Sequence, residues 1–402
     1  MPSDTNTLLK DTVRELARGL HEDTIANRRQ LHADPELSFA EHRTAAFVAR
    51  QLKTLNIPFV QSGGTGIAGL LHGGMPGRDR VIALRADMDA LPIREMNDVP
   101  YKSANDGVMH ACGHDAHTAS LLTTAAILSR MKERFGGTVK FIFQPGEEKI
   151  PGGASLMIRD GVLEDPHPDC ILGQHVMPEL PAGMVGFRSG SYMASSDELY
   201  LTVSGKGGHA ASPHLNTDPV LIACHLVTAL QQIVSRQANP LMPSVLSFGR
   251  FIAEGATNVI PDEVHIAGTF RTLDEQWRSD AHLKMKKMAL TLAESMGGRC
   301  SFEIRKGYPV LINEEKLNAG TRKHAEDYLG SERVTDLDIW MAAEDFAAYA
   351  QLLPGCFYRL GTGNEKRGIT SGVHTPTFDI DEQALETGPG LMAYLALKTL
   401  GN

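Results

Sequence analysis

The chain has 402 residues, of which 42% are hydrophobic and 22% are charged, and its formal net charge is -9. This composition is typical of a folded protein, and the length exceeds what a single hydrophobic core usually organises. Lysine and arginine are scattered along the chain and form no basic stripe, so we expect no nucleic-acid partner.

The compartment is predicted from the chain start and the cysteines. The first residues mix acidic and basic side chains without an apolar run, so no signal peptide is expected. No stretch reaches the roughly 18 uncharged apolar residues that a spanning helix needs. The five cysteines are odd in number and widely spaced, which suits a reducing compartment. We therefore expect a soluble, cytoplasmic protein with no membrane partner.

The first half of the chain has the pattern of an α/β protein. Two helices are predicted at its start, over residues 8–32 and 39–55, with Pro35 between them. Short apolar runs then alternate with helical patterns, which favours a layered α/β structure. The clearest elements of this alternation are three strands and one helix, over residues 81–85, 138–143, 169–173 and 116–132.

A different rhythm begins near residue 190. The pattern there reads strand, helix, strand, strand, helix, strand, with a first strand over residues 198–204 and helices near 219–235 and 275–295. This is the order of a compact split βαβ unit, and α/β alternation resumes after it. We therefore predict a main domain over residues 1–189 and 308–402 that carries an inserted domain over 190–307.

The strongest chemical signal is the segment 109–118, Met-His-Ala-Cys-Gly-His-Asp-Ala-His-Thr, which leads into the predicted helix. Residues two apart in an extended segment point the same way, so Cys112 and His114 are predicted to approach one centre. A thiolate with an imidazole favours a transition metal over magnesium or calcium. The alternative is a solvated histidine cluster, and the roles of His110 and His117 stay open.

Two adjacent glutamates, Glu147 and Glu148, follow the strand predicted over residues 138–143. Ligands and catalytic groups gather at strand ends in α/β sheets. Neighbouring carboxylates on a turn point in different directions, so one can bind a metal while the other moves protons. Alone, such a pair is more often a solvated turn beside a proline, and the surrounding motifs reverse this preference.

Other ligand-type side chains follow other predicted strands. His175 comes after the strand over residues 169–173, and His374 lies in a glycine-rich loop after a later strand. A single histidine in such a place is more often a structural hydrogen-bonding residue, but the joint pattern is hard to produce by chance. Asp87 and Asp89, just past an earlier strand, can orient a ligand histidine through its second ring nitrogen.

Eight segments, in order from about Arg28 to the carboxyl terminus, resemble one family of metal-dependent amidohydrolases and peptidases. This family includes hippurate hydrolase, bacterial N-acyl-L-amino-acid amidohydrolases and plant indoleacetyl-amino-acid hydrolases. The segments are residues 85–92, 109–118, 144–148, 173–178, 205–214, 258–261, 343–346 and 373–376. The resemblance implies an α/β fold: a mixed-sheet catalytic domain like that of di-zinc peptidases, with an inserted ferredoxin-like α+β domain for closure and dimerisation.

The resemblance also assigns the metal site. It implies two divalent ions per subunit, manganese or zinc, with nickel or cobalt as alternatives. Related di-zinc peptidases carry a histidine where Asp87 stands and a bridging carboxylate where Cys112 stands, so a bridging thiolate is expected here. Glu147 becomes the general base. The implied ligands are Cys112, His114, Glu148, His175 and His374.

Three residues of the inserted domain are candidates for substrate contact. The resemblance places His209 and Asn258 at the substrate, with His209 stabilising the oxyanion. In relatives the equivalent histidine reaches the active site of the partner subunit, which implies a homodimer or homotetramer through the inserted domain. Arg271 is a candidate for gripping a substrate carboxylate with two hydrogen bonds, and the alternative is an ordinary surface arginine.

The implied reaction is hydrolysis of a small-molecule N-acyl amino acid to a carboxylic acid and a free amino acid. A zinc-type ion lowers the pKa of its water to about 7, and Glu147 takes the proton and passes it to the leaving amine. One alternative is a di-metal dipeptidase or carboxypeptidase. Another is a covalent role for Cys112, and a third is a binding protein in which the metals only stabilise the fold. The motifs do not specify the acyl group.

Overall fold

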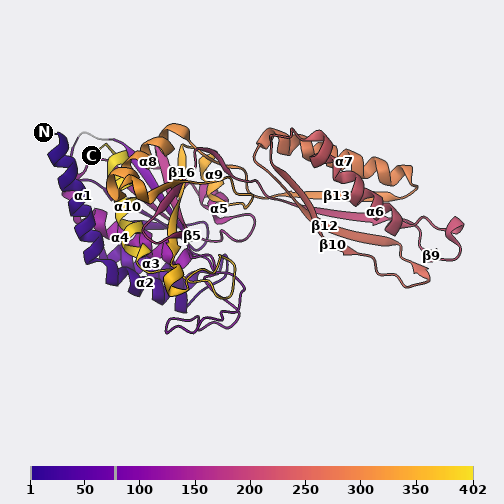
Figure 1. Ribbon diagram of the computed structural model, residues 1–402, viewed down its shortest axis with the longest axis horizontal. Coiled ribbons are helices and arrows are strands. Elements are labelled where there is room, and N and C mark those ends of the chain that lie inside the picture. The colour runs from indigo at the N-terminus through magenta and orange to yellow at the C-terminus, as the bar shows by residue number, and fades with distance from the viewer. Residues whose placement is uncertain (1, 77–78, 402) are drawn as a thin grey trace. The chain divides into compact units, whose positions relative to one another are not determined.

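The computed structural model describes residues 2–76 and 79–401, and the chain divides into two compact units (Figure 1). Unit 1 contains the chain up to Gly190 together with Ile312–Asp338 and the residues from Asp345 onward. Unit 2 contains Ser191–Leu311 and Ile339–Glu344. Each unit has its own buried apolar cluster.

Unit 1 is built on an eight-stranded mixed sheet in the order β1-β2-β4-β3-β5-β16-β6-β15. The four central strands β4, β3, β5 and β16 are parallel to one another. Every residue of β3 is buried, as expected for a strand in a sheet that is covered on both faces. The strands are β1 (Phe59–Ser62), β2 (Gly66–His72), β3 (Val81–Asp87), β4 (Thr138–Gln144), β5 (Cys170–Pro181), β6 (Val185–Phe187), β15 (Val334–Asp336) and β16 (Gly355–Gly363).

Helices pack around this sheet, and α4 and α10 are the most deeply buried of them. The long helix predicted over residues 8–32 is in fact two helices that meet at Leu20, because Gly19 ends the first and glycine is a poor helix former. The helices of unit 1 are α1 (Pro2–Gly19), α2 (His21–Ala33), α3 (His42–Thr54), α4 (His114–Arg130), α5 (Gly153–Arg159), α8 (Glu315–Leu329), α9 (Phe346–Ala350) and α10 (Ala384–Thr399), with short turns at Lys132–Arg134, Ser331–Arg333 and Glu365–Arg367.

Unit 2 has a four-stranded antiparallel sheet in the order β10-β12-β8-β13, with two helices packed on it. With the chain order βαββαβ, this strand order is that of a ferredoxin-like fold. The first helix begins at Pro219, capped by the Asp218 carboxylate, and ends five residues before the predicted residue 235. The main elements are β8 (Asp197–Ser204), α6 (Pro219–Leu230), β10 (Ser244–Ile252), β12 (Glu263–Thr272), α7 (Glu275–Ser295) and β13 (Arg299–Lys306).

Two short ribbons and two helical turns complete the elements. β9 (Gly208–His209) pairs with β11 (Val259–Ile260), and β7 (Gly190–Met193) pairs with β14 (Leu311–Asn313). The turns span Pro213–Leu215 and Ile233–Gln237.

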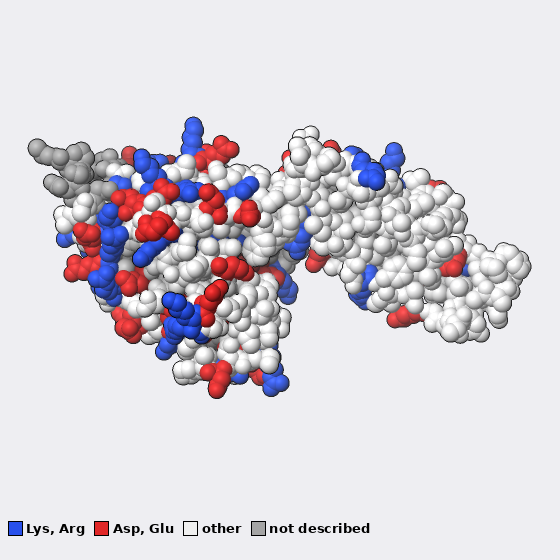
Figure 2. All heavy atoms as spheres, in the orientation of Figure 1, with Lys and Arg blue, Asp and Glu red and all other residues white. Residues whose placement is uncertain are grey.

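The surface charge and the composition of the helices are two further general features of the fold. On the visible face of unit 1, cationic and anionic side chains are interspersed and form no continuous basic stripe (Figure 2). Among the described residues, no helix combines the length and the apolar character that a membrane crossing requires.

Candidate metal centre

A tight turn brings Cys112 and His114 together. Cys112 lies in this turn and His114 is the first residue of α4, so the predicted extended segment is wrong. Gly113 between them has a φ of +82°, a backbone conformation that favours glycine. A Cβ atom on Gly113 would also lie 2.5 Å from Cγ2 of Val176 on β5. The left-handed turn, rather than strand alternation, directs both side chains to one point.

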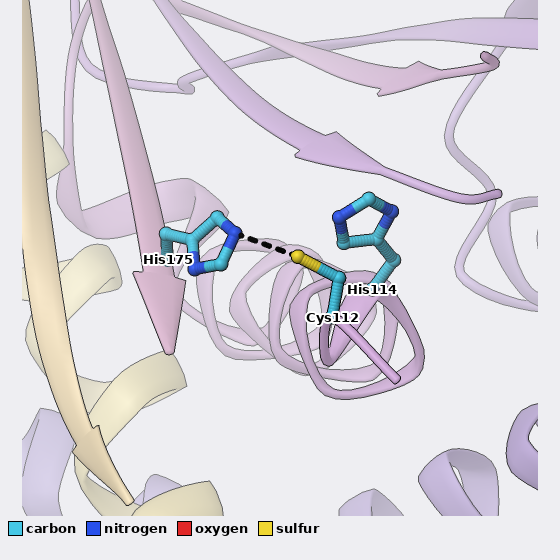
Figure 3. Close-up of side chains that lie close together, drawn as sticks. All are labelled: Cys112, His114 and His175. Atoms are coloured by element: carbon cyan, nitrogen blue, oxygen red, sulfur yellow. Dashed lines mark hydrogen bonds between the residues drawn. The ribbon is translucent and has the colours of Figure 1, made fainter. Parts of the chain in front are cut away.

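Five side chains form two sets that share Cys112. In one set, the ligand atoms of Cys112, His114 and His175 lie within 4.8 Å of one another, and in the other those of Cys112, Glu148 and His374 do. The sulfur of Cys112 is 3.4 Å from Nε2 of His175 and 3.3 Å from Nε2 of His374. Figure 3 shows the first set, with the thiol and the two rings pointing toward one another. All five predicted ligands are therefore brought together in unit 1.

The two histidines outside the turn are fixed through backbone groups. His175 on β5 has Nδ1 2.8 Å from the carbonyl oxygen of Val176, which leaves Nε2 facing Cys112. His374 has a positive φ of 62°, which is uncommon for a residue with a side chain. Its backbone N–H donates to the Ala111 carbonyl oxygen at 2.7 Å and holds the loop against the Cys112 turn. The His374 side chain is 51% exposed, whereas that of His114 is fully buried.

Asp89 fixes both a predicted ligand and the glutamate turn. Its buried carboxylate lies 3.1 Å from Nδ1 of His114 and accepts the backbone N–H groups of Glu147 and Glu148, each at 3.0 Å. It also accepts the Ser38 hydroxyl at 2.6 Å. Burial alone would raise the pKa of Asp89, but these hydrogen bonds lower it below the ordinary value. Asp89 is therefore ionised and holds four donors at once.

Asp87 faces a different histidine. Its carboxylate lies 2.6 Å from Nδ1 of His117 and accepts from Arg85 at 2.5 Å, whereas Nε2 of His114 is 3.8 Å away. Nε2 of His117 in turn accepts the backbone N–H of Val176 at 2.9 Å. Both ring nitrogens of His117 are thus engaged by protein groups, so its ring has no nitrogen to offer to an ion. Asp87 orients this structural ring rather than one of the predicted ligands.

His110 stands apart from the two sets. Its ring is buried, and neither ring nitrogen has a hydrogen-bond partner within the described chain. Burial lowers the pKa of His110 to about 4, so the ring is neutral at ordinary pH. The neighbouring aromatic ring is that of His32, at 6.4 Å between centroids.

The donor atoms of the two sets fit divalent cations. Nε2 of His114 and Oε1 of Glu148 are buried without a hydrogen bond in the described chain, a costly state for a polar atom. Oε1 of Glu148 does lie 3.0 Å from Nε2 of His374, but not in the geometry of a hydrogen bond. A cation that contacts these atoms relieves this cost.

The pKa shifts in the site indicate a surplus of negative charge. Burial would lower the pKa of His114, yet Asp87 and Asp89 outweigh it and raise this pKa to about 10. Burial raises the pKa of the Cys112 thiol well above its usual value, and Glu148 adds to the effect. Both groups therefore hold their protons in the absence of another cation. Bound divalent ions offset the same surplus and allow a thiolate and a neutral imidazole.

Glu147 lies beside the two sets without belonging to either. Its side chain is largely buried, and one of its carboxylate oxygens lies within 4.8 Å of ligand atoms of His114 and Glu148. Its Oε1 accepts the backbone N–H of Asp345 at 3.4 Å. The two adjacent carboxylates thus lie close together, and their division into a base and a ligand stays a prediction.

His209 and Asn258 are neighbours in unit 2. His209 pairs with Val259 across the β9–β11 ribbon, and the N–H of Ala210 donates to the Asn258 carbonyl oxygen at 3.0 Å. The His209 ring is exposed, and its Nδ1 accepts the N–H of Ala211 at 3.1 Å. The other ring nitrogen of His209 then carries the proton, as a hydrogen-bond donor requires.

Arg271 lies at the opposite end of unit 2 from this ribbon. Residues 205–207 hydrogen-bond to Asp262, so the ribbon adjoins the end of β12 that begins at Glu263. Arg271 is eight residues farther along β12, a distance of about 26 Å at the usual strand rise of about 3.3 Å. Arg271 is half-buried and donates to the Met341 carbonyl oxygen at 3.2 Å. Within one chain, therefore, a small molecule cannot touch both Arg271 and His209.

Sequence reasoning missed Ser38 and Arg85, whose side chains complete the support of Asp89 and Asp87. Ser38 lies 51 residues from Asp89 along the chain, and no spacing rule links the two positions. Arg85 stands in the same strand as Asp87, two residues earlier, so period-two alternation places both side chains on one face. That second signal was readable from the sequence.

Soft and hard ligands gathered around a glutamate beside a parallel sheet define a metallohydrolase. Residues 83–398 match the model of Peptidase family M20/M25/M40. The chain belongs to this family, and it is a metal-dependent hydrolase that acts on linear amide bonds.

Relatives with known names match along most of the chain. An N-acyl-L-amino acid amidohydrolase of Geobacillus stearothermophilus is 42% identical over 310 residues, 77% of this chain and 83% of the relative. Thermostable carboxypeptidase 2 of Saccharolobus solfataricus is 37% identical over 395 residues, 97% of this chain and 98% of the relative. The crystal structure of a dinuclear metal-binding peptidase of the M20 family from Bacillus subtilis matches with a TM-score of 0.82 and 34% identity, covering 96% of this chain and 99% of that one. The expected family and fold class are confirmed.

Asp89→Asn is expected to weaken binding of divalent ions by about tenfold to a hundredfold, the usual effect of losing a group that orients a ligand. In either orientation of the new side-chain amide at position 89, its NH₂ group faces the backbone N–H of Glu147 or of Glu148. Two donors then face each other, and one hydrogen bond is lost. Competition with a chelator of known affinity measures the change. Asp160→Asn is the control, because Asp160 accepts a backbone N–H from Gly63 away from the site. An Asp89→Asn protein that binds ions as tightly as this control would contradict the role of Asp89.

Proposed function

We propose that the chain hydrolyses the amide bond of N-acyl amino acids with two divalent cations bound in the two sets that share Cys112. Cys112, His114 and His175 would hold one ion, and Cys112, Glu148 and His374 would hold the other. The observation that carries the proposal is the shared thiol, because a single sulfur within reach of two complete ligand sets is suited to bridge two ions. Manganese or zinc is the expected metal, with nickel or cobalt as alternatives.

The bound ions, the base and the residues that orient the base have different roles in the reaction. When bound, the two ions supply a more acidic water and polarise the amide carbonyl. Glu147 accepts a proton from the attacking water and donates it to the leaving nitrogen. Asp89 holds the backbone of Glu147, and Asp345 donates to its carboxylate, so the base is oriented before substrate binds.

Unit 2 supplies the substrate contacts in this proposal. Arg271 grips the carboxylate of the amino acid, and the His209 ring donates to the oxyanion, with Asn258 beside it. Because about 26 Å separates Arg271 from the ribbon of His209 in one chain, the two contacts come from different subunits. A homodimer or homotetramer formed through unit 2 meets this requirement.

The substrate class is supported by the amidohydrolase that is 42% identical to the chain. The second candidate, cleavage of peptides at the carboxyl end, is favoured by the carboxypeptidase that matches 97% of the chain at 37% identity. Both reactions attack a linear amide next to a free carboxylate, so one site geometry serves both. The nature of the acyl group distinguishes the two substrate classes.

Glu147→Gln is expected to lower kcat by about a hundredfold to ten-thousandfold and to leave both ions bound, because an amide cannot take the proton from water. Steady-state kinetics with metal analysis of the purified protein measures both effects. Glu332→Gln, at an exposed position, is the matched control. Near-normal turnover by Glu147→Gln with full metal content would remove Glu147 from the reaction.

Chelation should abolish turnover reversibly, and manganese, zinc, cobalt or nickel should restore it to different extents. This result excludes a covalent role for Cys112, which predicts a trapped acyl-enzyme and activity that survives a strong chelator. It also excludes a binding protein in which the metals only stabilise the fold, because chelation would then mainly lower the melting temperature. Rates and melting curves recorded on the same stripped and reloaded samples distinguish the three cases.

A substrate panel tests the acyl group. We expect the reloaded enzyme to hydrolyse acetyl, benzoyl or indoleacetyl amino acids with a higher kcat/KM than dipeptides that carry a free amino terminus. Release of the free amino acid is measured for each compound under the same conditions. A clear preference for the dipeptides, or for longer peptides, would favour the second candidate.

A further inference from the structure

The segment of residues 36–41 supports the site from outside the metal ligands. Its Ser38 hydroxyl donates to Asp89, and the Glu36 carbonyl oxygen accepts the N–H of Ala90 at 2.8 Å. The segment thus holds the Asp89 loop through two hydrogen bonds. Its last residue, Glu41, contacts the other part of the site, the turn that carries Glu147.

The Glu41 carboxylate is buried and accepts three hydrogen bonds. Its Oε1 accepts the backbone N–H of Gly146 at 2.8 Å and that of Phe39 at 2.9 Å, and its Oε2 accepts the Thr65 hydroxyl at 2.6 Å. Its exposed fraction is 0%. A buried carboxylate is costly to keep, so its place beside the residue that precedes Glu147 calls for an explanation.

Gly146 is tightly enclosed on the side of this segment. Its φ is +54°, and a Cβ atom there would lie 2.2 Å from Cε1 of Phe39. Phe39 itself has a positive φ of 67°. Two left-handed residues therefore press against each other, and the Glu41 carboxylate joins their backbone N–H groups. This arrangement leaves the peptide that leads into Glu147 little freedom to rotate.

We infer that Glu41 is a positioning residue, which fixes the orientation of the Glu147 carboxylate through its hydrogen bond to the Gly146 backbone. The inference rests on the proposed role of Glu147 as the base. Asp89 holds the N–H of Glu147 itself and Glu41 holds the N–H one residue earlier, so the turn is fastened at consecutive peptides. Unlike Asp89, Glu41 accepts its hydrogen bonds from residues that are not predicted ligands, so its removal is expected to act on the base and to leave the ions bound.

The required property of Glu41 is its acceptor oxygen and not its charge. In Glu41→Gln the amide oxygen keeps both backbone N–H donors, and the amide NH₂ donates to the Thr65 oxygen, which then accepts. In Glu41→Ala the N–H of Gly146 loses its partner. The two variants therefore separate the hydrogen bond from the charge.

Glu41→Ala is expected to lower kcat by about tenfold to a hundredfold, because small misplacements of a catalytic group reach that size. The KM should stay within about twofold and both ions should stay bound, and Glu41→Gln should recover kcat to within about threefold. Kinetics on the best substrate of the panel and metal analysis of the purified enzyme give these values. A normal kcat in Glu41→Ala, a parallel loss of ions, or an equally poor Glu41→Gln would overturn the inference.

Glu314→Ala is the control, because the Glu314 carboxylate has a structural task at the start of α8, away from the site. It accepts the backbone N–H of Leu317 at 2.6 Å. Its loss should lower the melting temperature and leave kcat unchanged. If Glu41→Ala does not fold, Thr65→Val is the second variant, because it removes one donor to Glu41. It should lower kcat about threefold with both ions retained. An unchanged kcat in Thr65→Val would overturn the inference.

A double variant separates this inference from the proposed function. If Glu41 acts only through the base, adding Glu41→Ala to Glu147→Gln should cause no further loss of kcat. A further tenfold loss in the double variant would show that Glu41 acts elsewhere. Normal turnover by Glu147→Gln alone would instead refute the proposed base. If Glu41→Ala has a normal kcat whereas Glu147→Gln is inactive, only the positioning role of Glu41 is refuted.

Discussion

The site depends on one buried carboxylate that receives four hydrogen-bond donors. Asp89 fixes the ring of His114, the backbone of both glutamates and the side chain of Ser38. Each of these donors would cost about 1–3 kcal/mol if it were left buried without a partner, so the groups are interdependent. The orientation of a predicted ligand and that of the proposed base therefore depend on the same anion.

The excess of negative charge around this carboxylate explains why the cluster requires cations. Asp87, Asp89 and Glu147 are buried and Glu148 is partly buried, and the Arg85 guanidinium is bonded to Asp87. The raised pKa values of His114 and Cys112 show that these groups keep protons as long as no other positive charge is close. Folding thus brings together a ligand set whose electrostatic balance is completed by metal ions.

The sequence predicted the types of side chain in the site better than their geometry. The types and spacing of the side chains pointed to Cys112 and His114, and the end of a strand pointed to the pair of Glu147 and Glu148, whereas the full ligand set came from the resemblance to the family. The extended conformation expected for Cys112 and His114 was wrong, since the left-handed Gly113 makes a turn there. The bond from Glu41 to Gly146 spans 105 residues of sequence, and only the folded chain brings these two positions together.

The close approach of Gly113 to Val176 has a consequence for mutational tolerance. Any side chain at position 113 collides with a residue of β5 that directly follows His175, at 2.5 Å for the first added atom. Such a replacement damages the site by displacing a neighbouring strand, rather than by altering its own loop. A saturation library at this codon should therefore retain glycine almost alone, although the residue has no functional group to contribute.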